Sequence, residues 1–450
     1  MSIKKSEFFL PLAAFLLLCL ALSLIWTQSA WLLLLVTAAL AVLFLSFVLP
    51  RPAFIALIIL RTATDFLTTA NIFTVGSWSL NYTSLLGVIA IIFALATIWR
   101  QKLWRELPPL AVNWLLFLGL ATILTIFSSY PAVGLVETLR WSSFFSLFVL
   151  GFALFRGGPQ SSNLVKAIIA SAALPVAAAL WQSLSGQEFF DGERWRVLGT
   201  FTHPNMLAFY LVYVSVLTLF IFLTLDKGAK QKYLYFLISL PLLSALLLTY
   251  TRGAWLAFFL VIVLIGLFRF RRFLITVTLA ISLLYLSLLP FQTRVASLTN
   301  LSATDSAAWR LDLWRDAWGY AQKNIWLGSG PGTAPLIIAA NRPINLGSTE
   351  PHNDYIKIVL EMGLIGVGIY LSLIISLLWH LLKAWRQEVW PRRQLLFLFL
   401  AVFSLALYGA SIGDNILKDS PLQWSFWALI GSLMYSYGQI KKSSNDLTTK

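Results

Sequence analysis

Residues 205–225 have the sequence NMLAFYLVYVSVLTLFIFLTL, and none of them is charged. Because about 20 apolar helical residues cross the hydrocarbon layer of a bilayer, this stretch is long enough to span a membrane. Comparable runs recur, and we predict an all-α, polytopic membrane helix bundle. We place fourteen spans at 8–26, 30–49, 53–70, 80–98, 110–127, 134–155, 164–184, 205–225, 232–250, 253–269, 273–290, 356–381, 393–412 and 421–438. Twelve spans remain if two of these runs are re-entrant or interfacial.

The composition of the chain indicates the same class. Of the 450 residues, 59% are apolar and 11% are charged, whereas soluble domains have about 45–50% and about 25%. These values exclude a disordered chain, a coiled coil and a soluble enzyme with a single anchor. The formal charge of +15 would suggest nucleic-acid binding in a soluble protein. In a membrane protein it reflects the enrichment of basic residues in the loops on the cytoplasmic side of the bilayer.

The basic residues alternate between the connecting segments. With the N-terminus inside, every cytoplasmic segment contains lysine or arginine, whereas the short outer segments 27–29, 71–79 and 128–133 contain none. This pattern follows the positive-inside rule and predicts that both termini are cytoplasmic. The predicted organisation is N-terminal helices in 1–130, a core in 131–290, an outer loop in 291–355, C-terminal helices in 356–440 and a cytoplasmic tail in 441–450.

Three outer segments carry arginine and histidine on the side where positive charge is disfavoured. They are 185–204 (SGQEFFDGERWRVLGTFTHP), the turn 249–253 (TYTRG) and the long loop 291–355. Arginine suits an anion site, because its planar fork donates two parallel hydrogen bonds to phosphate and keeps its charge. The alternative is snorkelling to lipid head groups or local ion pairing, as between Arg315 and Asp312. For Arg252 we favour a functional role, since its place between two apolar runs fixes it near the interface.

Residues 303–325 of the long loop predict an amphipathic helix that begins near Thr304 or Asp305. This helix either lies in the membrane interface or packs onto the bundle. Its predicted apolar face consists of Leu311, Trp314, Trp318, Ala321 and Ile325.

The end of the long loop carries a second pattern of interest. Gly328–Gly332 (GSGPG) predicts a turn, because it lacks the Lys-Ser/Thr ending of a phosphate-binding loop. His352 precedes the next span and therefore lies near the bilayer surface, as a structural donor or as a general base whose neutral form is favoured by nearby arginines. The glycines that follow permit close approach of another backbone. They are Gly363, Gly366 and Gly368.

Two ionisable pairs fall within predicted spans. They are Arg61 with Asp65, four residues apart, and Glu137 with Arg140, three apart. Each pair can simply neutralise itself, or Glu137 and Arg140 can reach the outer site. The single cysteine and three dispersed histidines, of which His380 is given no role, predict no disulfide and no metal site.

Three motifs in order resemble the O-antigen ligase/polymerase superfamily of bacterial polytopic membrane glycosyltransferases. They are G-T-F-x-H-P-N-x-L-A at Gly199–Ala208, preceded by Arg196, then T-R-G-A-W at Thr251–Trp255, then H-N-D-Y followed by G-L-I-G at His352–Gly366. The resemblance covers about 130–440. The ligase pattern continues after the second glycine with Thr-x-Trp, where this chain has Val367 and Ile369, which leaves ligase and polymerase both open.

The resemblance implies a site at the periplasmic face of the bacterial inner membrane. It implies an undecaprenyl pyrophosphate-linked glycan as donor, and lipid A–core, a glycan chain or a protein as acceptor, without metal, nucleotide sugar or another cofactor. By position, Arg196 and Arg252 match arginines that hold the pyrophosphate, and His352 matches the histidine that activates the acceptor hydroxyl. We add six candidate substrate-binding residues: Arg310, His203, Asn205, Asn353, Arg140 and Glu137.

A membrane transporter of a small anion such as bicarbonate is the alternative hypothesis. Transporters need polar groups near the bilayer midplane, broken helices and internal repeats. The spans offer only the two ionisable pairs and Pro175 at such depth, and no clear repeat. A cavity lined by Arg196, Arg252 and His352 and open sideways to lipid would favour the enzyme.

Overall fold

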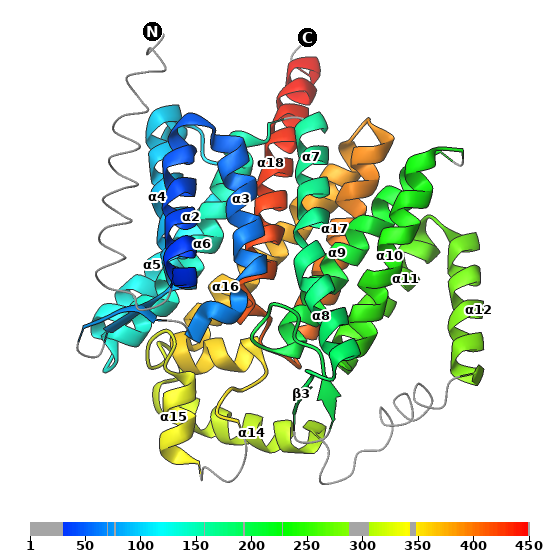
Figure 1. The fold of residues 1–450 in the computed structure, drawn as a ribbon. Helices are drawn as coiled ribbons and strands as arrows, with labels where there is room; N and C mark the ends of the chain where they lie inside the picture. The colour runs from blue at the N-terminus through cyan, green and yellow to red at the C-terminus, as the bar shows by residue number, and fades with distance from the viewer. Residues whose placement is uncertain are drawn as a thin grey trace.

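A computed structural model describes residues 30–69, 71–75, 78–156, 158–191, 194–226, 228–287, 306–342 and 348–448. These residues form a bundle of antiparallel helices with a smaller helical layer across one end (Figure 1). The predicted all-α membrane class is thereby confirmed. The first predicted span, 8–26, lies outside the described residues.

The elements follow one another in a simple order. The α-helices are α2 (Ala30–Val48), α3 (Pro50–Ala63), α4 (Tyr82–Gln101), α5 (Ala111–Phe127), α6 (Pro131–Leu154), α7 (Gly158–Ser171), α8 (Ala173–Ser185), α9 (Pro204–Thr224), α10 (Lys230–Leu248), α11 (Arg252–Phe268), α12 (Arg271–Ser287), α14 (Ser306–Ala321), α15 (Ala334–Asn341), α16 (Asp354–Gln387), α17 (Pro391–Ala410) and α18 (Ser420–Thr448). The 3-10 turns are η1 (Asp65–Thr69), η2 (Leu103–Arg105), η3 (Gln322–Asn324) and η5 (Ile416–Lys418). Two antiparallel hairpins pair β1 (Asn71–Val75) with β2 (Trp78–Asn81) and β3 (Phe189–Phe190) with β4 (Trp195–Arg196).

Every predicted span from residue 30 onward coincides with helix, but the lengths differ. Seven described helices are long and apolar enough to cross a membrane, counting 160–185 as one, and three shorter apolar helices add to them. The predicted span 53–70 is shorter than expected. Its helix α3 ends at Ala63, since the next residue, Thr64, has the non-helical backbone angles φ −127° and ψ 21°, and its hydroxyl donates to Leu60 O.

The predicted span 164–184 is divided into α7 and α8. Pro175 has no N–H to donate to the carbonyl of Ser171, four residues earlier. The hydroxyl of Thr62 on α3 donates to this Ser171 oxygen instead, at 3.2 Å. The break is therefore compensated by a neighbouring helix, as helices in lipid require.

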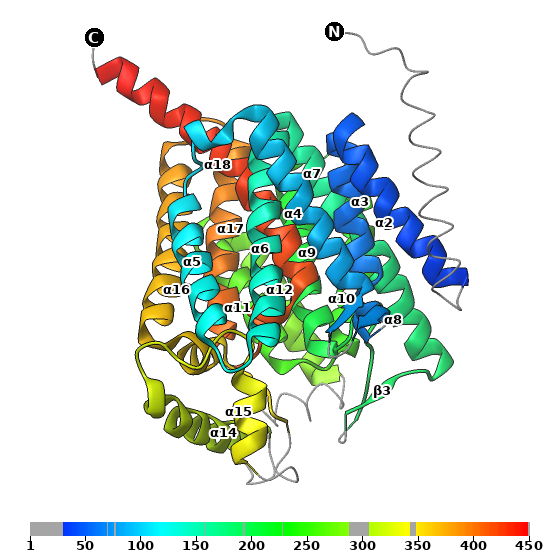
Figure 2. The ribbon, with the colours of Figure 1, turned by 90° about the vertical axis from the view of Figure 1, so that its left-hand side faces the viewer.

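The two ends of the bundle separate the predicted inner and outer segments. At the end where α18 finishes, Arg51 donates to Leu154 O and Arg100 to Phe47 O, which ties three predicted cytoplasmic segments together. The opposite end carries α14, α15 and the β3 hairpin (Figures 1 and 2). This arrangement follows the predicted alternation, and the side of the membrane that each end faces stays a prediction.

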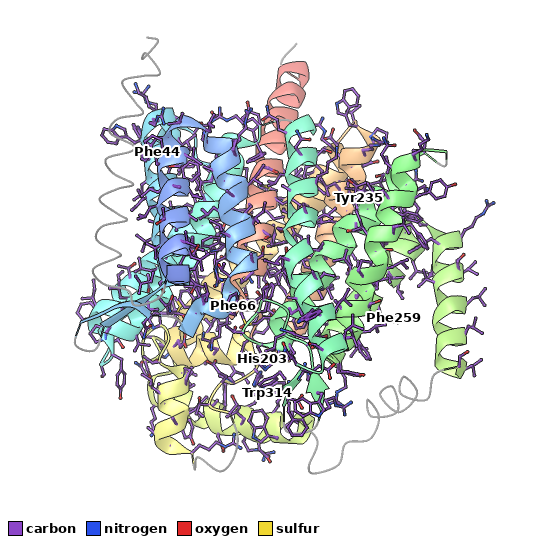
Figure 3. The ribbon with its side chains drawn as sticks, viewed as in Figure 1. Phe44, Phe66, His203, Tyr235, Phe259 and Trp314 are labelled. Atoms are coloured by element: carbon purple, nitrogen blue, oxygen red, sulfur yellow. The ribbon has the colours of Figure 1, made fainter. Side chains whose placement is uncertain are left out.

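Aromatic side chains fill the centre, where α6 packs along α18. Trp141, Trp424 and Trp427 are almost fully buried. Trp424 Nε1 donates to Ser143 Oγ at 2.8 Å, so the polar edge of this indole is satisfied inside the bundle. Figure 3 shows His203 and Trp314 at the end with α14, away from this aromatic core.

The predicted loop helix exists as α14, but its buried face differs from the prediction. Leu313, Ala317 and Ala321 are buried against α16, whereas Leu311 and Trp318 are 55% and 44% exposed. The two alanines let the helix approach closely. Ala321 belongs to the predicted face, whereas Leu313 and Ala317 do not, so the prediction is correct only in part. Of the two alternatives, α14 packs onto the bundle. The predicted cap at Thr304 or Asp305 lies outside the described residues.

The segment 325–330, which includes the start of the GSGPG turn, hydrogen-bonds to α16 on both sides of a break in that helix. We call this contact the clasp. Gly363 has φ 66° and ψ −169°, so the helix axis is interrupted there. Ser329 N donates to Leu360 O and Gly330 N to Glu361 O, while Leu364 N donates to Ile325 O and Ile365 N to Trp326 O. A Cβ on Gly363 would lie 2.2 Å from Trp326 O, and one on Gly328 would lie 2.5 Å from Glu361 O. The predicted close backbone approach is therefore confirmed at Gly363, whereas Gly368 faces open space.

Candidate active site

Five segments converge at the end of the bundle that carries α14. They are the β3–β4 hairpin, the starts of α9, α11 and α16, and the link 411–419 between α17 and α18. Each helix start exposes backbone N–H groups and a partial positive charge. The sequence places polar residues at these starts, and their side chains form one connected network.

Arg196 on β4 is the buried anchor of this network, with 8% of its surface exposed. Its Nε donates to Thr249 O at 2.7 Å, its Nη1 to Asp191 Oδ2 at 2.9 Å, and its Nη2 to both Asn205 Oδ1 and Thr251 Oγ1 at 2.7 and 2.8 Å. Four of its five N–H groups are thus directed at the protein. Arg196 therefore holds the hairpin, α9 and α11 in register, with one N–H remaining for a ligand.

The network continues in one direction to the candidate histidine. Asn205 accepts from Arg196 through Oδ1, so its Nδ2 points the other way and donates to Asp414 Oδ2 at 2.6 Å. The second oxygen of Asp414 accepts from Asn415 N and lies 3.8 Å from His352 Nδ1. Arginine can only donate, so the polarity of the chain is fixed and its far end presents a carboxylate to His352.

The charge of Asp414 is favoured by its surroundings. Burial alone raises the pKa of this carboxyl, but the adjoining His352 and the positive Arg310 outweigh burial and hold the pKa below its ordinary value. Asp414 is therefore ionised at neutral pH. A carboxylate beside an imidazole orients the ring and stabilises its protonated form, as in hydrolase triads.

The backbone at His352 is constrained. His352 has φ 49°, in the left-handed region that non-glycine residues rarely adopt. The preceding Pro351 O accepts from Trp314 Nε1 at 2.7 Å, and the ring of Trp309 meets the imidazole edge to face at 5.9 Å. Both tryptophans come from α14, so this helix fixes the position of the histidine. Such strain is maintained at functional sites by the surrounding packing.

Arg310 on α14 reaches the same link. Its Nη1 donates to Gly413 O at 2.9 Å, next to Asp414. Its buried Nε has no acceptor among the described residues, and the same is true of His352 Nδ1. The Arg310 Nε donor is therefore unsatisfied beside Asp414, whereas His352 Nδ1 faces the Asp414 carboxylate at 3.8 Å. A buried donor is normally paired, so Arg310 Nε indicates a place for an anionic or hydroxylated ligand.

Arg252 and His203 stand at helix starts on the same network. Arg252 is the half-buried first residue of α11, directly after Thr251, which accepts from Arg196. His203 caps α9, with Nδ1 accepting from Asn205 N at 3.1 Å. Burial, assisted by positive Arg196, lowers the pKa of His203 to about 4. His203 is therefore neutral at working pH and acts as a helix cap.

The remaining predicted residues do not join this network. Asn353 is the N-cap of α16, and its Oδ1 accepts from Tyr355 N and Ile356 N. Glu137 lies buried on α6, paired with Arg140 at 2.5 Å and with Lys357 at 2.9 Å. The predicted Glu137–Arg140 and Arg61–Asp65 pairs are both confirmed, the second at 2.6 Å.

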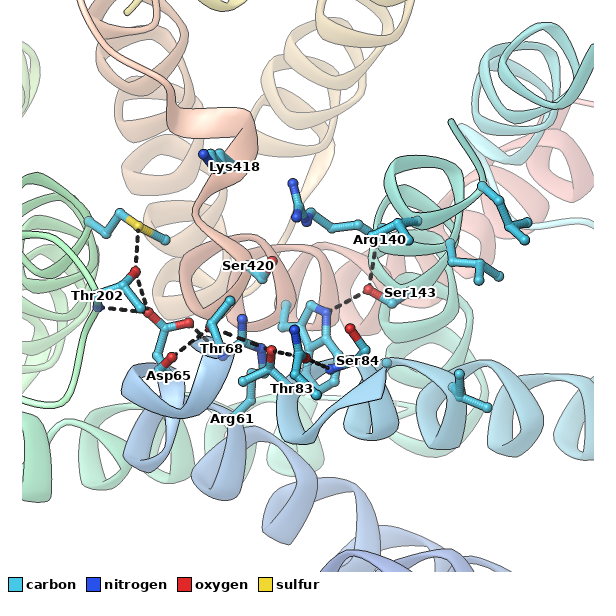
Figure 4. A pocket seen from close by; sticks show the side chains of 18 residues that line it. Arg61, Asp65, Thr68, Thr83, Ser84, Arg140, Ser143, Thr202, Lys418 and Ser420 are labelled. Atoms are coloured by element: carbon cyan, nitrogen blue, oxygen red, sulfur yellow. Dashed lines mark hydrogen bonds and ion pairs between the residues drawn. The ribbon is translucent and has the colours of Figure 1, made fainter. Parts of the chain in front are cut away.

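A cavity of about 380 Å³ adjoins the network on the side of α4 and α6 (Figure 4). Its lining includes Arg61, Arg140 and Lys418, whereas Arg196, Arg252 and His352 are not among its lining residues. The three predicted catalytic residues thus gather at one end of the bundle without sharing this cavity. Thr202 lines the cavity, while the nearby Asn205 faces the network.

Sequence reasoning missed Asp414 and Lys357. Asp414 lies in a short link between two apolar runs. The same feature led us to favour a functional role for Arg252, and it could have identified Asp414. Lys357 lies within a predicted span, where a charge indicates a partner. Its partner is Glu137, 220 positions away, which the sequence pattern does not reveal.

Comparison with known proteins agrees with this arrangement. Residues 234–371 match the family model described as O-antigen ligase. The match contains the T-R-G-A-W and H-N-D-Y motifs together with α14, and it confirms the predicted resemblance over this segment. It supports a membrane glycosyltransferase of the O-antigen ligase/polymerase type in general. No curated protein matches the chain.

Proposed function

We propose that this protein transfers a glycan from undecaprenyl pyrophosphate to an acceptor hydroxyl at the periplasmic face of the bacterial inner membrane. The observation that carries the proposal is the one-directional chain from Arg196 through Asn205 and Asp414 to His352, with Arg310 beside it. A carboxylate opposite an imidazole, next to arginines, suits the joining of a hydroxyl to a carbon that bears a phosphate leaving group.

His352 is the proposed general base. Asp414 faces its Nδ1, so Nε2 remains to take the proton of the acceptor hydroxyl. The separation of 3.8 Å shortens when the imidazole becomes charged, since catalytic contacts are often long before substrate binds. The acceptor oxygen then bonds to the anomeric carbon as the bond from that carbon to the pyrophosphate oxygen breaks. The proton stays on His352, and undecaprenyl pyrophosphate leaves.

Arg252 and Arg310 are the proposed contacts to the pyrophosphate. Negative charge grows on the leaving oxygen as the glycosyl bond breaks, and fixed guanidinium groups stabilise it more in the transition state than in the ground state. Arg196, by contrast, donates most of its N–H groups to protein acceptors. We therefore assign it the role of positioning Asn205 and Thr251.

The experiment is transfer in vitro by the purified full-length protein, with an undecaprenyl pyrophosphate-linked glycan as donor. Lipid A–core, a glycan chain and a peptide are supplied separately as acceptors. His352→Gln can hydrogen-bond a hydroxyl but cannot take its proton, so we expect turnover to fall at least about a hundredfold. His380→Gln, on the spanning part of α16, is the matched control and should retain activity. Equal turnover of the two variants would refute the general base.

The predicted orientation is tested separately. Cys19 is replaced, and single cysteines are introduced at Ser348, which is exposed, and at Val389, which is 85% exposed on the opposite end. A membrane-impermeant maleimide should label Ser348→Cys in intact spheroplasts and Val389→Cys only after lysis. The reverse pattern would place the site in the cytoplasm and overturn the proposal.

A further inference from the structure

The cavity beside the network has a lining of two kinds. It lies between η1, α4, α6, the start of α9 and the start of α18 (Figure 4). One part of its wall is cationic and hydroxylated, and the other is aliphatic. A cavity with such a division fits an amphipathic ligand better than a small ion or a sugar.

The polar wall carries more positive than negative charge. Arg61, Arg140 and Lys418 line it, together with one carboxylate, Asp65. Asp65 is already engaged, with one oxygen 2.6 Å from Arg61 and the other accepting from the amide and hydroxyl of Thr202. Asp65 therefore balances Arg61. The other two lining cations have their carboxylate partners outside the lining, Glu137 for Arg140 and Glu350 for Lys418.

Arg140 has N–H groups that are not engaged by the described residues. Among the described residues it donates only through Nη1, to Glu137, and Glu137 also accepts from Lys357. Glu137 thus pairs with two cations, of which Lys357 also lies 3.9 Å from Glu361, while Nε and Nη2 of Arg140 have no acceptor among the described residues. The Arg140 side chain is 26% exposed and, in Figure 4, its guanidinium extends from α6 toward the same space as Lys418.

Hydroxyl groups complete the polar wall. Thr68, Thr83, Ser84 and Ser420 surround the space below Lys418. Lys418 itself is 41% exposed and pairs with Glu350. Hydroxyls and a guanidinium fork are the groups that bind phosphate oxygens in proteins.

The aliphatic wall is formed by one face of α6. Leu135, Val136 and Leu139 line the cavity and are 38%, 46% and 38% exposed. Exposed aliphatic side chains on a helix of a membrane-spanning bundle suit contact with hydrocarbon. This wall is therefore where the chain of an amphipathic ligand would lie, while its polar end contacts the cations.

We propose that this cavity binds the phosphate head group of an acidic membrane lipid, with the hydrocarbon chain along the aliphatic wall of α6. Arg140 and Lys418 hold the phosphate, and the hydroxyl groups of Ser84 and Ser420 donate to its oxygens. The site is separate from the network at His352 and does not depend on the proposed transfer reaction. Lipid binding is therefore measured directly, without reference to turnover.

Gly87 offers a variant that closes the cavity without touching a charge. It lines the space from α4, and an added Cβ would lie 4.0 Å from Ser143 Cβ, so a side chain fits without backbone clash. Leucine there favours helix and fills the cavity. Gly119 on α5 also has open space and is exposed, but it does not line the cavity, so Gly119→Leu is the matched control.

The experiment is native mass spectrometry of the full-length protein with phosphatidylglycerol, phosphatidylcholine, undecaprenyl phosphate and inorganic phosphate as probes. We expect Gly87→Leu and Arg140→Gln each to reduce phosphatidylglycerol adducts at least tenfold. Gly119→Leu should behave like the wild type. Arg315→Gln should do so too, because among the described residues the 81% exposed Arg315 pairs only with Asp312. Phosphatidylcholine should bind at least tenfold less than phosphatidylglycerol, because its choline cancels the phosphate charge.

The probes distinguish the sources of the phosphate. Stronger binding of undecaprenyl phosphate than of phosphatidylglycerol would support the site and identify a polyprenyl lipid as its occupant. Displacement of phosphatidylglycerol by millimolar inorganic phosphate would identify a site for soluble anions and overturn the lipid assignment. Unchanged lipid binding by Gly87→Leu would overturn the proposal altogether, because this variant fills the cavity whatever the fate of the charges.

Discussion

Asp414→Asn is the substitution that tests the polarity of the network most directly. Asparagine has nearly the shape of aspartate, but its amide has only one acceptor oxygen. Asp414 now accepts from two donors, Asn205 Nδ2 and Asn415 N, on different oxygens. Asn205 cannot reverse its amide to help, since its oxygen is held by Arg196 at 2.7 Å. One donor is therefore left facing an NH₂ group.

The expected loss can be estimated from the same distances. An unpaired buried donor costs about 1–3 kcal/mol in stability. Separately, two unit charges about 4 Å apart attract by about 4 kcal/mol at an effective dielectric constant near 20, and Asp414 lies 3.8 Å from His352. This attraction exists only once His352 has taken a proton, so it stabilises the transition state. We expect kcat/KM to fall about a thousandfold.

The assay is the transfer reaction described above, with folding checked by size-exclusion chromatography and thermal unfolding in detergent. Asp312→Asn is the control, because Asp312 is 64% exposed and, in the part of the chain that the structure describes, pairs only with Arg315. Its activity should stay within a factor of two of the wild type. If Asp414→Asn is folded and retains more than a third of wild-type kcat/KM, the carboxylate does not stabilise a protonated His352, and the mechanism is wrong.

Three further predictions follow from the helix starts and the clasp. Arg252→Lys keeps the charge but loses the bidentate fork, so turnover should fall about a hundredfold with normal membrane insertion; near-normal turnover would make Arg252 an interface anchor. His203→Asn keeps the cap of α9 but removes a histidine whose pKa burial lowers to about 4, so the wild type should lose thermal stability as pH falls from about 6.5 toward 4 and the variant should lose less; identical pH dependence would contradict this. Gly363→Ala should lower the thermal midpoint markedly, because its Cβ would meet Trp326 backbone atoms at 2.2 Å, whereas Gly368→Ala should not; equal midpoints would exclude the clasp as a stabilising contact.

Most of the fold could be predicted from the sequence because lipid leaves few alternatives. An uncharged run such as 205–225 must satisfy its backbone internally, and a helix does so. The face of α14 could not be predicted in the same way. Its contact with α16 buries Leu313 and the small Ala317 beside the predicted Ala321, and that choice depends on a partner surface the sequence does not display. The break at 171–172 likewise required Thr62 from another helix.

The sequence predicted which residues form the candidate site better than it predicted the role of each residue. The three motifs brought Arg196, Asn205 and His352 to one end, and the structure connects them. Two of the N–H groups of Arg196 donate to Thr249 and Thr251, which become its neighbours only after folding. The sequence therefore does not show how many of its donors remain for a ligand. Asp414 was missed because its partners lie 62 and 209 positions away in the chain.

The clasp between the GSGPG turn and the break in α16 limits how this loop can be exchanged between relatives. Four backbone hydrogen bonds join 325–330 to 360–365, and each side has a glycine whose missing Cβ makes room for the other. The two segments are thus halves of one joint. In a chimaera that receives the outer loop of a relative but keeps the residues 360–365 of this chain, the two sides of the clasp would not match. The helix α14 would then no longer hold His352 in place. Swaps intended to change acceptor choice should therefore move 306–365 as a single cassette.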